Sequence, residues 1–158
     1  MNPKIVNALT QLSQAVRQIF QFEQLVYADP GERNVVSELF AMLRPYFPQH
    51  TVSYEYDRRE QEIKRLGTSR IIPDLIVHRV GDQDENLLVV EVKLAGNYNY
   101  ASDVHKLIGM TDPDGEYRYA VGVHLILDVP RRRVYRGQVY IDGLVNSDLT
   151  AWFEAKSA

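Results

Sequence analysis

The sequence predicts an α/β fold in which helices flank a mixed central β-sheet. Residues up to about 45 carry apolar side chains at helical spacing, whereas residues from 52 onward alternate or run apolar as strands do. The expected order is helix, helix, three strands, helix, two strands and a helix, and elements in that order pack as helices on the faces of one sheet. A length of 158 residues fits one core, so we predict a single domain over residues 1–158.

A long amphipathic helix is predicted over residues 3–27, because apolar residues recur there at helical spacing: Ile5, Leu9, Leu12, Val16 and Ile19. A second helix is predicted over about residues 30–45. Asp29 is its expected N-cap, Pro30 its first residue and Glu32 a capping-box glutamate. The prolines at 45 and 48 are expected to end it, because proline breaks helical hydrogen bonding.

Three strands are predicted next. Residues 52–57 alternate apolar and polar side chains, which is typical of a half-buried strand. Residues 72–79 and 87–93 are expected to pair as a hairpin, because the polar turn GDQDEN joins them. The segment LLVVEVKL is apolar on both parities until Glu91, which indicates a central strand covered on both faces.

The remainder of the chain is predicted to form a mixture of helices and strands. The segment YAVGVHLILDV indicates another buried strand, because it is almost wholly apolar. The other expected elements are a short helix at 101–110, a strand at 133–141 and a short helix around 149–154, so that residues 129–158 supply a C-terminal strand and helix.

Composition and charge exclude several classes of protein. No apolar run approaches the roughly 20 residues of a membrane span, and the N-terminus lacks the pattern of a secretory signal. The absence of cysteine excludes disulfides, thiolate zinc sites and cysteine nucleophiles. With a formal net charge of -3, binding to nucleic acid needs a local basic patch. We therefore expect a cytoplasmic protein without a membrane partner.

Three charged residues at the ends of the predicted hairpin form the candidate functional site. Glu91 and Lys93 are two residues apart on a strand and so point to one face. Antiparallel pairing is expected to bring Asp74, at the start of one strand, close to Glu91, at the end of the other. Two carboxylates can bind a hard divalent cation, and a lysine beside them can stabilise negative charge on a phosphorus centre. The trio therefore predicts a site for phosphodiester hydrolysis.

The same residues have structural alternatives. A Pro-Asp pair commonly belongs to a turn, and a glutamate and a lysine two apart commonly form a solvated face or an ion pair. Leu87 and Val89 share the parity of Glu91 and Lys93, which favours a buried row over an exposed one. Because burial of unpaired charges costs several kcal/mol, the charges indicate either a site or a buried ion-pair network.

Five short motifs occur along the chain in the order GERN, EYDR, PDLIVH, NLLVVEVK and DVHKL. They resemble the NER, EYNR, PDIIVH, NLLVIEVK and D..KL motifs of a bacterial and phage subgroup of the PD-(D/E)XK nuclease superfamily. The PD pair is Pro73–Asp74 and the EVK triplet is 91–93. Gly31, Asp57 and Leu94 depart from the subgroup, but these positions only flank the charged trio.

The resemblance covers about residues 29–128 and implies a restriction-endonuclease-like fold, here with an added long N-terminal helix. It implies that Asp74, Glu91 and the backbone carbonyl of Val92 hold magnesium or manganese, and that Lys93 orients or activates the attacking water.

The resemblance also implies an acid from the first core helix. Glu32 is favoured, because it extends the apolar stripe seven residues before Leu39, whereas Glu38 lies about 100° off that stripe. A capping-box role is the structural alternative for Glu32.

Asp103 and Lys106 match the D..KL motif and lie three apart on one helix face, where they either support the site or contact phosphate, or form a surface ion pair. His78 and His124 are interpreted as hydrogen-bonded structural histidines. Candidates for contacts with backbone phosphates, with a solvated strand face as the alternative, are Arg131, Arg132 and Arg133.

The resemblance implies a magnesium-dependent endonuclease that hydrolyses nucleic acid, DNA rather than RNA, in phage defence, a mobile element or repair. The resemblance also implies a homodimer. Because 158 residues hold no recognisable target-recognition domain, we expect weak sequence specificity or a partner protein that supplies it. Two other classes stay open. The first is a nuclease-fold module that binds nucleic acid or assembles without cutting, and the second is an interaction protein in which residues 3–27 mediate oligomerisation.

Overall fold

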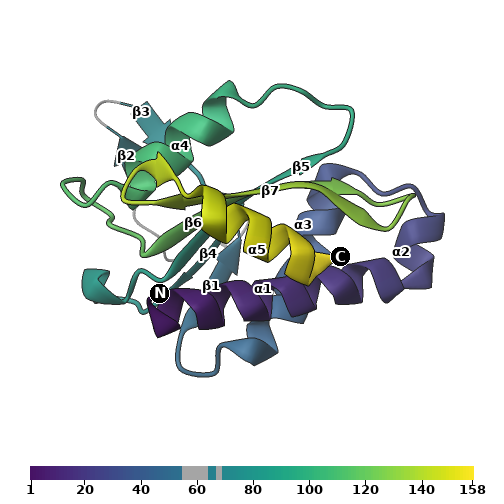
Figure 1. Cartoon of the computed structure of the whole chain (residues 1–158), viewed down its shortest axis with the longest axis horizontal. Coiled ribbons are helices and arrows are strands. Elements are labelled where there is room, and N and C mark those ends of the chain that lie inside the picture. Colours follow the sequence, from purple (N-terminus) through teal and green to yellow (C-terminus); the bar gives the residue numbers. More distant parts are fainter. Residues whose placement is uncertain (55–63, 67–68) are drawn as a thin grey trace.

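The structure, a computed structural model, describes residues 1–54, 64–66 and 69–158. Its main sheet contains six strands and is mixed, as predicted, because β5 and β6 run parallel while the other neighbours run antiparallel (Figure 1). The order across this sheet is β1 (Thr51–Tyr54), β4 (Leu75–His78), β5 (Leu88–Leu94), β6 (Val121–Asp128), β7 (Arg133–Ile141) and β8 (Leu144–Val145). A separate two-stranded sheet pairs β2 (Lys64–Leu66) with β3 (Ser69–Ile71).

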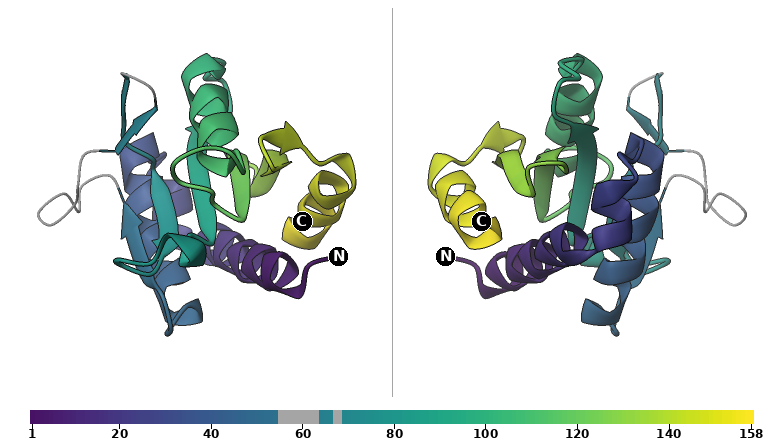
Figure 2. Two further views of the ribbon diagram at one scale, coloured as in Figure 1. Left: turned by 90° about the vertical axis from the view of Figure 1, so that its left-hand side faces the viewer. Right: turned by 90° about the vertical axis from the view of Figure 1, so that its right-hand side faces the viewer.

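Helices cover both faces of the main sheet (Figures 1 and 2). One face packs against α1 (Pro3–Gln21), α3 (Glu32–Leu43) and α5 (Ser147–Ser157), and the larger apolar core lies between these helices and the strands. The other face is covered by α4 (Ala101–Thr111) over a smaller cluster that includes Val89 and Leu107. Within the described ranges, no helix is long and apolar enough to cross a membrane.

The helix predicted over residues 3–27 is interrupted at Phe22, so α1 is followed by a separate short helix, α2 (Glu23–Tyr27). In one continuous helix Leu25, six residues after Ile19, points roughly 120° away from it and misses the core. The break lets Leu25 become buried. At the end of α1 the guanidinium of Arg132 donates a 2.8 Å hydrogen bond to the carbonyl of Phe20, which lacks a helical partner in the last turn.

The second helix starts two residues later than predicted. Gly31 is the N-cap of α3 and Glu32 is its first residue, so the expected roles of Asp29 as cap and of Glu32 in a capping box are wrong. Asp29 instead adopts a left-handed conformation with φ of 48°, which aspartate tolerates better than most residues. The helix ends at Leu43 and continues as a 3-10 turn over Arg44–Tyr46.

The predicted hairpin is confirmed as the antiparallel pair β4 and β5. A 3-10 turn, Gln83–Glu85, lies within the polar connection. The strand β4 begins only at Leu75, so Asp74 lies just before it. Leu87 was expected to share a face of the strand with Val89 and Glu91. It instead precedes β5 and packs into the larger core, so this expectation is wrong.

The other predicted elements also form. The helix α4 and the strands β6 and β7 lie where the sequence placed them, whereas α5 is longer than expected. The strand predicted over 52–57 is described only to Tyr54, and residues 55–57 lie outside the described part of the chain.

Candidate functional site

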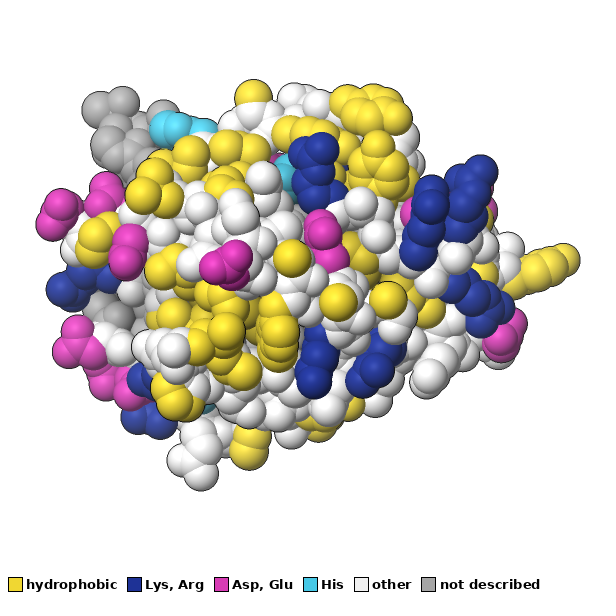
Figure 3. All heavy atoms as spheres, in the orientation of Figure 1, with side chains coloured by type: hydrophobic (Ala, Val, Ile, Leu, Met, Phe, Trp, Pro, Cys, Tyr) yellow, Lys and Arg dark blue, Asp and Glu magenta, His cyan; other side chains and the backbone are white. Residues whose placement is uncertain are grey.

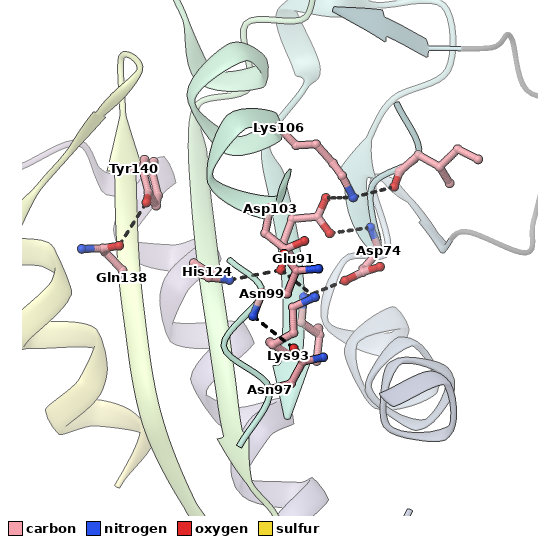
Figure 4. Close-up of polar contacts among 12 residues, drawn as sticks. Asp74, Glu91, Lys93, Asn97, Asn99, Asp103, Lys106, His124, Gln138 and Tyr140 are labelled. Carbon is pink, nitrogen blue, oxygen red and sulfur yellow. Dashed lines mark hydrogen bonds and ion pairs between the residues drawn. The ribbon is translucent and has the colours of Figure 1, made fainter. Parts of the chain in front are cut away.

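The pairing of β4 with β5 brings Asp74 and Glu91 together, as predicted (Figure 4). Leu75 pairs with Val90, so Asp74, just before β4, and Glu91, in β5, come next in the same register. The backbone N–H of Asp74 donates to Oε2 of Glu91 at 3.3 Å. The N–H of Val92 donates to Oδ2 of Asp74 at 2.8 Å. Because β4 begins only at Leu75, the Asp74 carboxylate, and not a strand carbonyl, accepts the hydrogen bond from the Val92 N–H.

Glu91 is fully buried and has Lys106 of α4 as its counter-charge. The Lys106 Nζ lies 3.0 Å from Glu91 Oε1 and also donates to the carbonyl of Ile72 at 3.3 Å. Burial and the neighbouring Asp74 charge raise the pKa of Glu91 well above its ordinary value, although Lys106 opposes the shift. Burial acts to lower the pKa of Lys106, but the carboxylates of Glu91, Asp74 and Asp103 together leave that pKa raised.

Lys93 belongs to a second group of charges, on the same face of β5. Its ammonium lies 3.3 Å from Oδ2 of Asp103, and Nε2 of His124 lies 3.2 Å from the same oxygen (Figure 4). Burial acts to raise the pKa of Asp103, yet the hydrogen bond from His124 and the charge of Lys93 leave it lowered. Because Glu91 and His124 are partners in the parallel β5–β6 register, the two groups of charges are neighbours.

The imidazole of His124 is buried and packs against an aromatic ring. The ring of Tyr100 meets it edge to face with centroids 5.1 Å apart, and the guanidinium of Arg136 lies 5.6 Å from the Tyr100 centroid. The Nδ1 atom of His124 is buried and finds no hydrogen-bond partner in the described part of the chain. Nε2 of His124 is therefore hydrogen-bonded to Asp103, while Nδ1 is buried without a hydrogen-bond partner among the described residues.

The structure excludes one of the two alternatives for the D..KL motif. Asp103 and Lys106 do not form a surface ion pair with each other, because each reaches a partner on β5. His78 and His124 are hydrogen-bonded, as interpreted: His78 Nε2 lies 3.3 Å from the Ser53 hydroxyl. The sequence did not indicate that His124 joins the charged network, since its position beside Glu91 follows only from the order of the strands.

The candidate helix acids are both half-buried on α3, Glu32 in its first turn and Glu38 further along. Among the described residues, no three histidine, aspartate or glutamate side chains gather into a group that could hold a metal ion. Neither Glu32 nor Glu38 therefore completes a three-carboxylate group with Asp74 and Glu91.

The arginines of the β6–β7 turn divide into two groups. Arg132 pairs with Glu23 through two hydrogen bonds of 3.0 and 2.8 Å. Arg131 and Arg133 instead pair with Asp128, at 3.2 and 3.3 Å. The three guanidinium groups are therefore fixed by two different acids, Glu23 and Asp128.

The oxygen donors that could bind a cation are the carboxylates of Asp74 and Glu91 and the carbonyl of Val92. In a strand, the N–H and C=O of one residue point to the same side. Because the Val92 N–H reaches Asp74, the Val92 carbonyl is expected on that side as well. Such a set of hard oxygen donors fits a magnesium or manganese ion.

Comparison of the chain with protein-family models, with curated proteins and with solved structures finds no match.

Proposed function

We propose that the protein is a metal-dependent nuclease with a restriction-endonuclease-like fold that hydrolyses phosphodiester bonds of DNA. The observation that carries this proposal is the meeting of Asp74 and Glu91 where β4 begins beside β5, with Lys93 on the same face of β5 as Glu91. The five motifs that resemble the nuclease subgroup support it, because these three residues occupy the PD and EVK positions.

Asp74, Glu91 and the Val92 carbonyl would hold the cation, with water and substrate phosphate as its other ligands. A bound magnesium ion supplies a Lewis acid that polarises the phosphoryl oxygen and lowers the pKa of a bound water. The raised pKa of Glu91 fits this role, since a buried carboxylate is stabilised in its charged form by a nearby cation.

Lys93 would donate a proton or a hydrogen bond to the phosphate or to the attacking water. Its side chain is 12% exposed and is fixed through its contact with Asp103. The charge that develops on a phosphoryl group in the transition state is stabilised by such a preorganised donor. Asp103 acts as a positioning residue here, and His124 orients Asp103.

A second candidate function is favoured by the pairing of the charges. Glu91 has Lys106 as its counter-charge and Asp103 has Lys93, so each buried acid is already neutralised within the chain. These ion pairs would be sufficient for a domain that keeps this fold and binds nucleic acid without cutting it, because such a domain needs no metal ion to balance the buried acids. The third candidate, oligomerisation through residues 3–27, is disfavoured because the apolar stripe of α1 is buried in the core of its own chain.

The proposal is tested by cleavage of supercoiled plasmid, single-stranded DNA and structured RNA in magnesium, manganese or chelator. The wild type is compared with Asp74→Ala and Lys93→Ala, and Arg118→Gln is the control because it changes a half-exposed charge elsewhere. We expect cutting of DNA that requires the cation, is abolished in Asp74→Ala, is strongly reduced in Lys93→Ala and is unchanged in Arg118→Gln.

Two other results would refute the proposal in different ways. Cutting that survives both Asp74→Ala and Lys93→Ala would mean that the site lies elsewhere. A wild type that cuts none of the substrates, yet binds nucleic acid, would favour the module that binds without cutting.

A further inference from the structure

A cavity of about 370 Å³ lies at the carboxyl ends of the parallel strands β5 and β6. Leu94 and Leu127, at the ends of these two strands, line it together with residues of the α2–α3 connection, the β5–α4 connection and the β6–β7 turn. In open α/β sheets, ligands bind in the crevice outside the carboxyl ends of the strands. The cavity therefore occupies a place where a ligand is expected, and the candidate cleavage site does not include it.

Two guanidinium groups stand at this cavity in a fixed arrangement. Arg131 Nη1 and Arg133 Nε lie 3.2 and 3.3 Å from the same oxygen of Asp128, whose side chain is only 6% exposed. Burial acts to raise the pKa of Asp128, but the hydrogen bonds from both arginines leave it lowered, so the carboxylate stays charged beneath them. The arginine side chains are 73% and 58% exposed, and each keeps N–H donors beyond the one given to Asp128. Guanidinium groups held in this way suit a phosphate.

Exposed aromatic rings and a carboxylate complete the lining. Tyr98 is 70% exposed and Tyr135 is 48% exposed, and both border the cavity. Exposed aromatic rings stack on nucleobases of any sequence. Asp29 lines the cavity from the α2–α3 connection, and an aspartate accepts hydrogen bonds from the amino group of a base. In the space-filling view, basic side chains gather over the β6–β7 turn, next to hydrophobic ones (Figure 3).

The size and position of the cavity indicate that it would hold a single nucleotide and not a duplex. Its volume lies at the lower end of the range of about 300–1,000 Å³ for small-ligand pockets. Leu94, which lines the cavity, directly follows Lys93 on β5, and a strand advances about 3.3 Å per residue, so the backbone at the cavity lies only a few ångströms from that at Lys93. A strand whose phosphate lies at Lys93 thus reaches the cavity within one or two nucleotides.

We infer that this cavity binds an unpaired nucleotide of the nucleic-acid strand, with its base against Tyr98 and Tyr135 and its phosphate at Arg131 and Arg133. The inference rests on the proposed function for the class of ligand. It adds that the protein engages single-stranded or locally opened nucleic acid beside the site of cleavage.

The test measures, by fluorescence anisotropy, the affinity of the full chain for a short fluorescein-labelled oligodeoxyadenylate. A chelator is present so that the oligonucleotide is not cleaved. Tyr98→Ala is expected to weaken binding about 5- to 150-fold, the effect of losing one stacked base, whereas Tyr98→Phe keeps the ring and is expected to bind as the wild type does. Arg131→Gln is expected to lower the slope of log affinity against log salt by about 0.7. The control for Arg131→Gln is Arg118→Gln. Arg118 also pairs with one acid, but it precedes the amino end of β6, whereas the cavity lies at the carboxyl end of that strand.

The outcomes separate this inference from the proposed function. If Tyr98→Ala and Arg131→Gln weaken binding but the wild type cuts nothing, the cavity is supported and hydrolysis is refuted. If the wild type cuts and requires Asp74, while both variants bind as the wild type does, hydrolysis stands and the cavity assignment is overturned. Absence of single-strand binding by the wild type, or tighter binding of a duplex of the same length that neither variant affects, would also overturn the assignment.

Discussion

The ammonium of Lys106 lies 3.0 Å from a carboxylate oxygen of Glu91, a side chain that is completely buried at the centre of the sheet. A buried ion pair contributes little net stability, but removal of one partner leaves an uncompensated charge that costs about 3–5 kcal/mol. The helix α4 therefore neutralises the acid that β5 carries into the core.

This pair predicts strong coupling between two substitutions. Lys106→Met is expected to lower the free energy of unfolding by about 3–5 kcal/mol, because Glu91 then lacks a counter-charge. The double variant Lys106→Met with Glu91→Gln is expected to recover much of that loss. Urea denaturation of the wild type, both single variants and the double variant measures the coupling, and simple additivity of the two single effects would contradict it.

Lys93 and Asp103 are predicted to affect catalysis to different extents. Lys93→Ala is expected to lower the rate of DNA cleavage by about a hundred- to ten-thousand-fold, as for loss of a group that transfers a proton in the transition state. Asp103→Asn is expected to lower it less, since Asp103 only positions the ammonium at 3.3 Å. Single-turnover cleavage assays give both rates, and a larger effect at Asp103 would show that the assigned roles are wrong.

Asp103 also predicts a dependence of stability on acid pH. Its pKa in the folded chain is lowered by His124 and Lys93 despite burial, so its stabilising contribution is present above the ordinary pKa of aspartate, about 4. That contribution is lost as the pH falls through the lowered value, with a slope of at most about 1.4 kcal/mol per pH unit.

Urea unfolding at a series of pH values below about 5 measures this contribution, because that range covers the ordinary and the lowered pKa of an aspartate. The wild type is expected to lose stability more steeply than Asp103→Asn. Asp84→Asn, which removes a carboxylate that is 89% exposed, is expected to follow the wild type. Equal slopes in all three proteins would argue against the contribution of Asp103.

Binding of a divalent cation is predicted to stabilise the fold. A ligand present at a hundred times its Kd adds about 2.7 kcal/mol to the free energy of unfolding. Magnesium or manganese is therefore expected to raise the Tm of the wild type and of Asp84→Asn, but not that of Asp74→Asn. Thermal melts with and without cation test this independently of cleavage, and an equal rise in Asp74→Asn would place the cation elsewhere.

Gly137 predicts a stability effect remote from the site. A Cβ atom at this position in β7 meets two ring atoms of Phe153 in α5, at 2.7 and 2.8 Å. Gly137→Ala is expected to cost about 1–3 kcal/mol, because the aromatic ring must shift within a packed core. Gly31→Ser is the control, since that N-cap position has open space and serine suits it. Comparable melting temperatures for the two variants would contradict the predicted crowding.

Local patterns in the sequence predicted the mixed sheet and the meeting of Asp74 with Glu91. Asp74 directly precedes β4 and Glu91 lies in β5, and a short polar turn joins these two strands, so the antiparallel register follows from nearby sequence. The strands β6 and β7 and the helix α4 were also predicted, because their apolar runs and periods are strong. The interruption at Phe22 was not, since it depends on where the core needs Leu25.

The sequence by itself determined that Glu91 enters the core, because it interrupts an apolar run, and that Asp74, just before the partner strand, lies beside it. Only the tertiary structure decided which lysine neutralises which acid: Lys106 pairs with Glu91, and Lys93 pairs with Asp103. It likewise decided that His124 completes the network. These contacts depend on how α4 crosses β5 and on the parallel alignment of β5 with β6, and such long-range packing leaves no periodic signal in the chain.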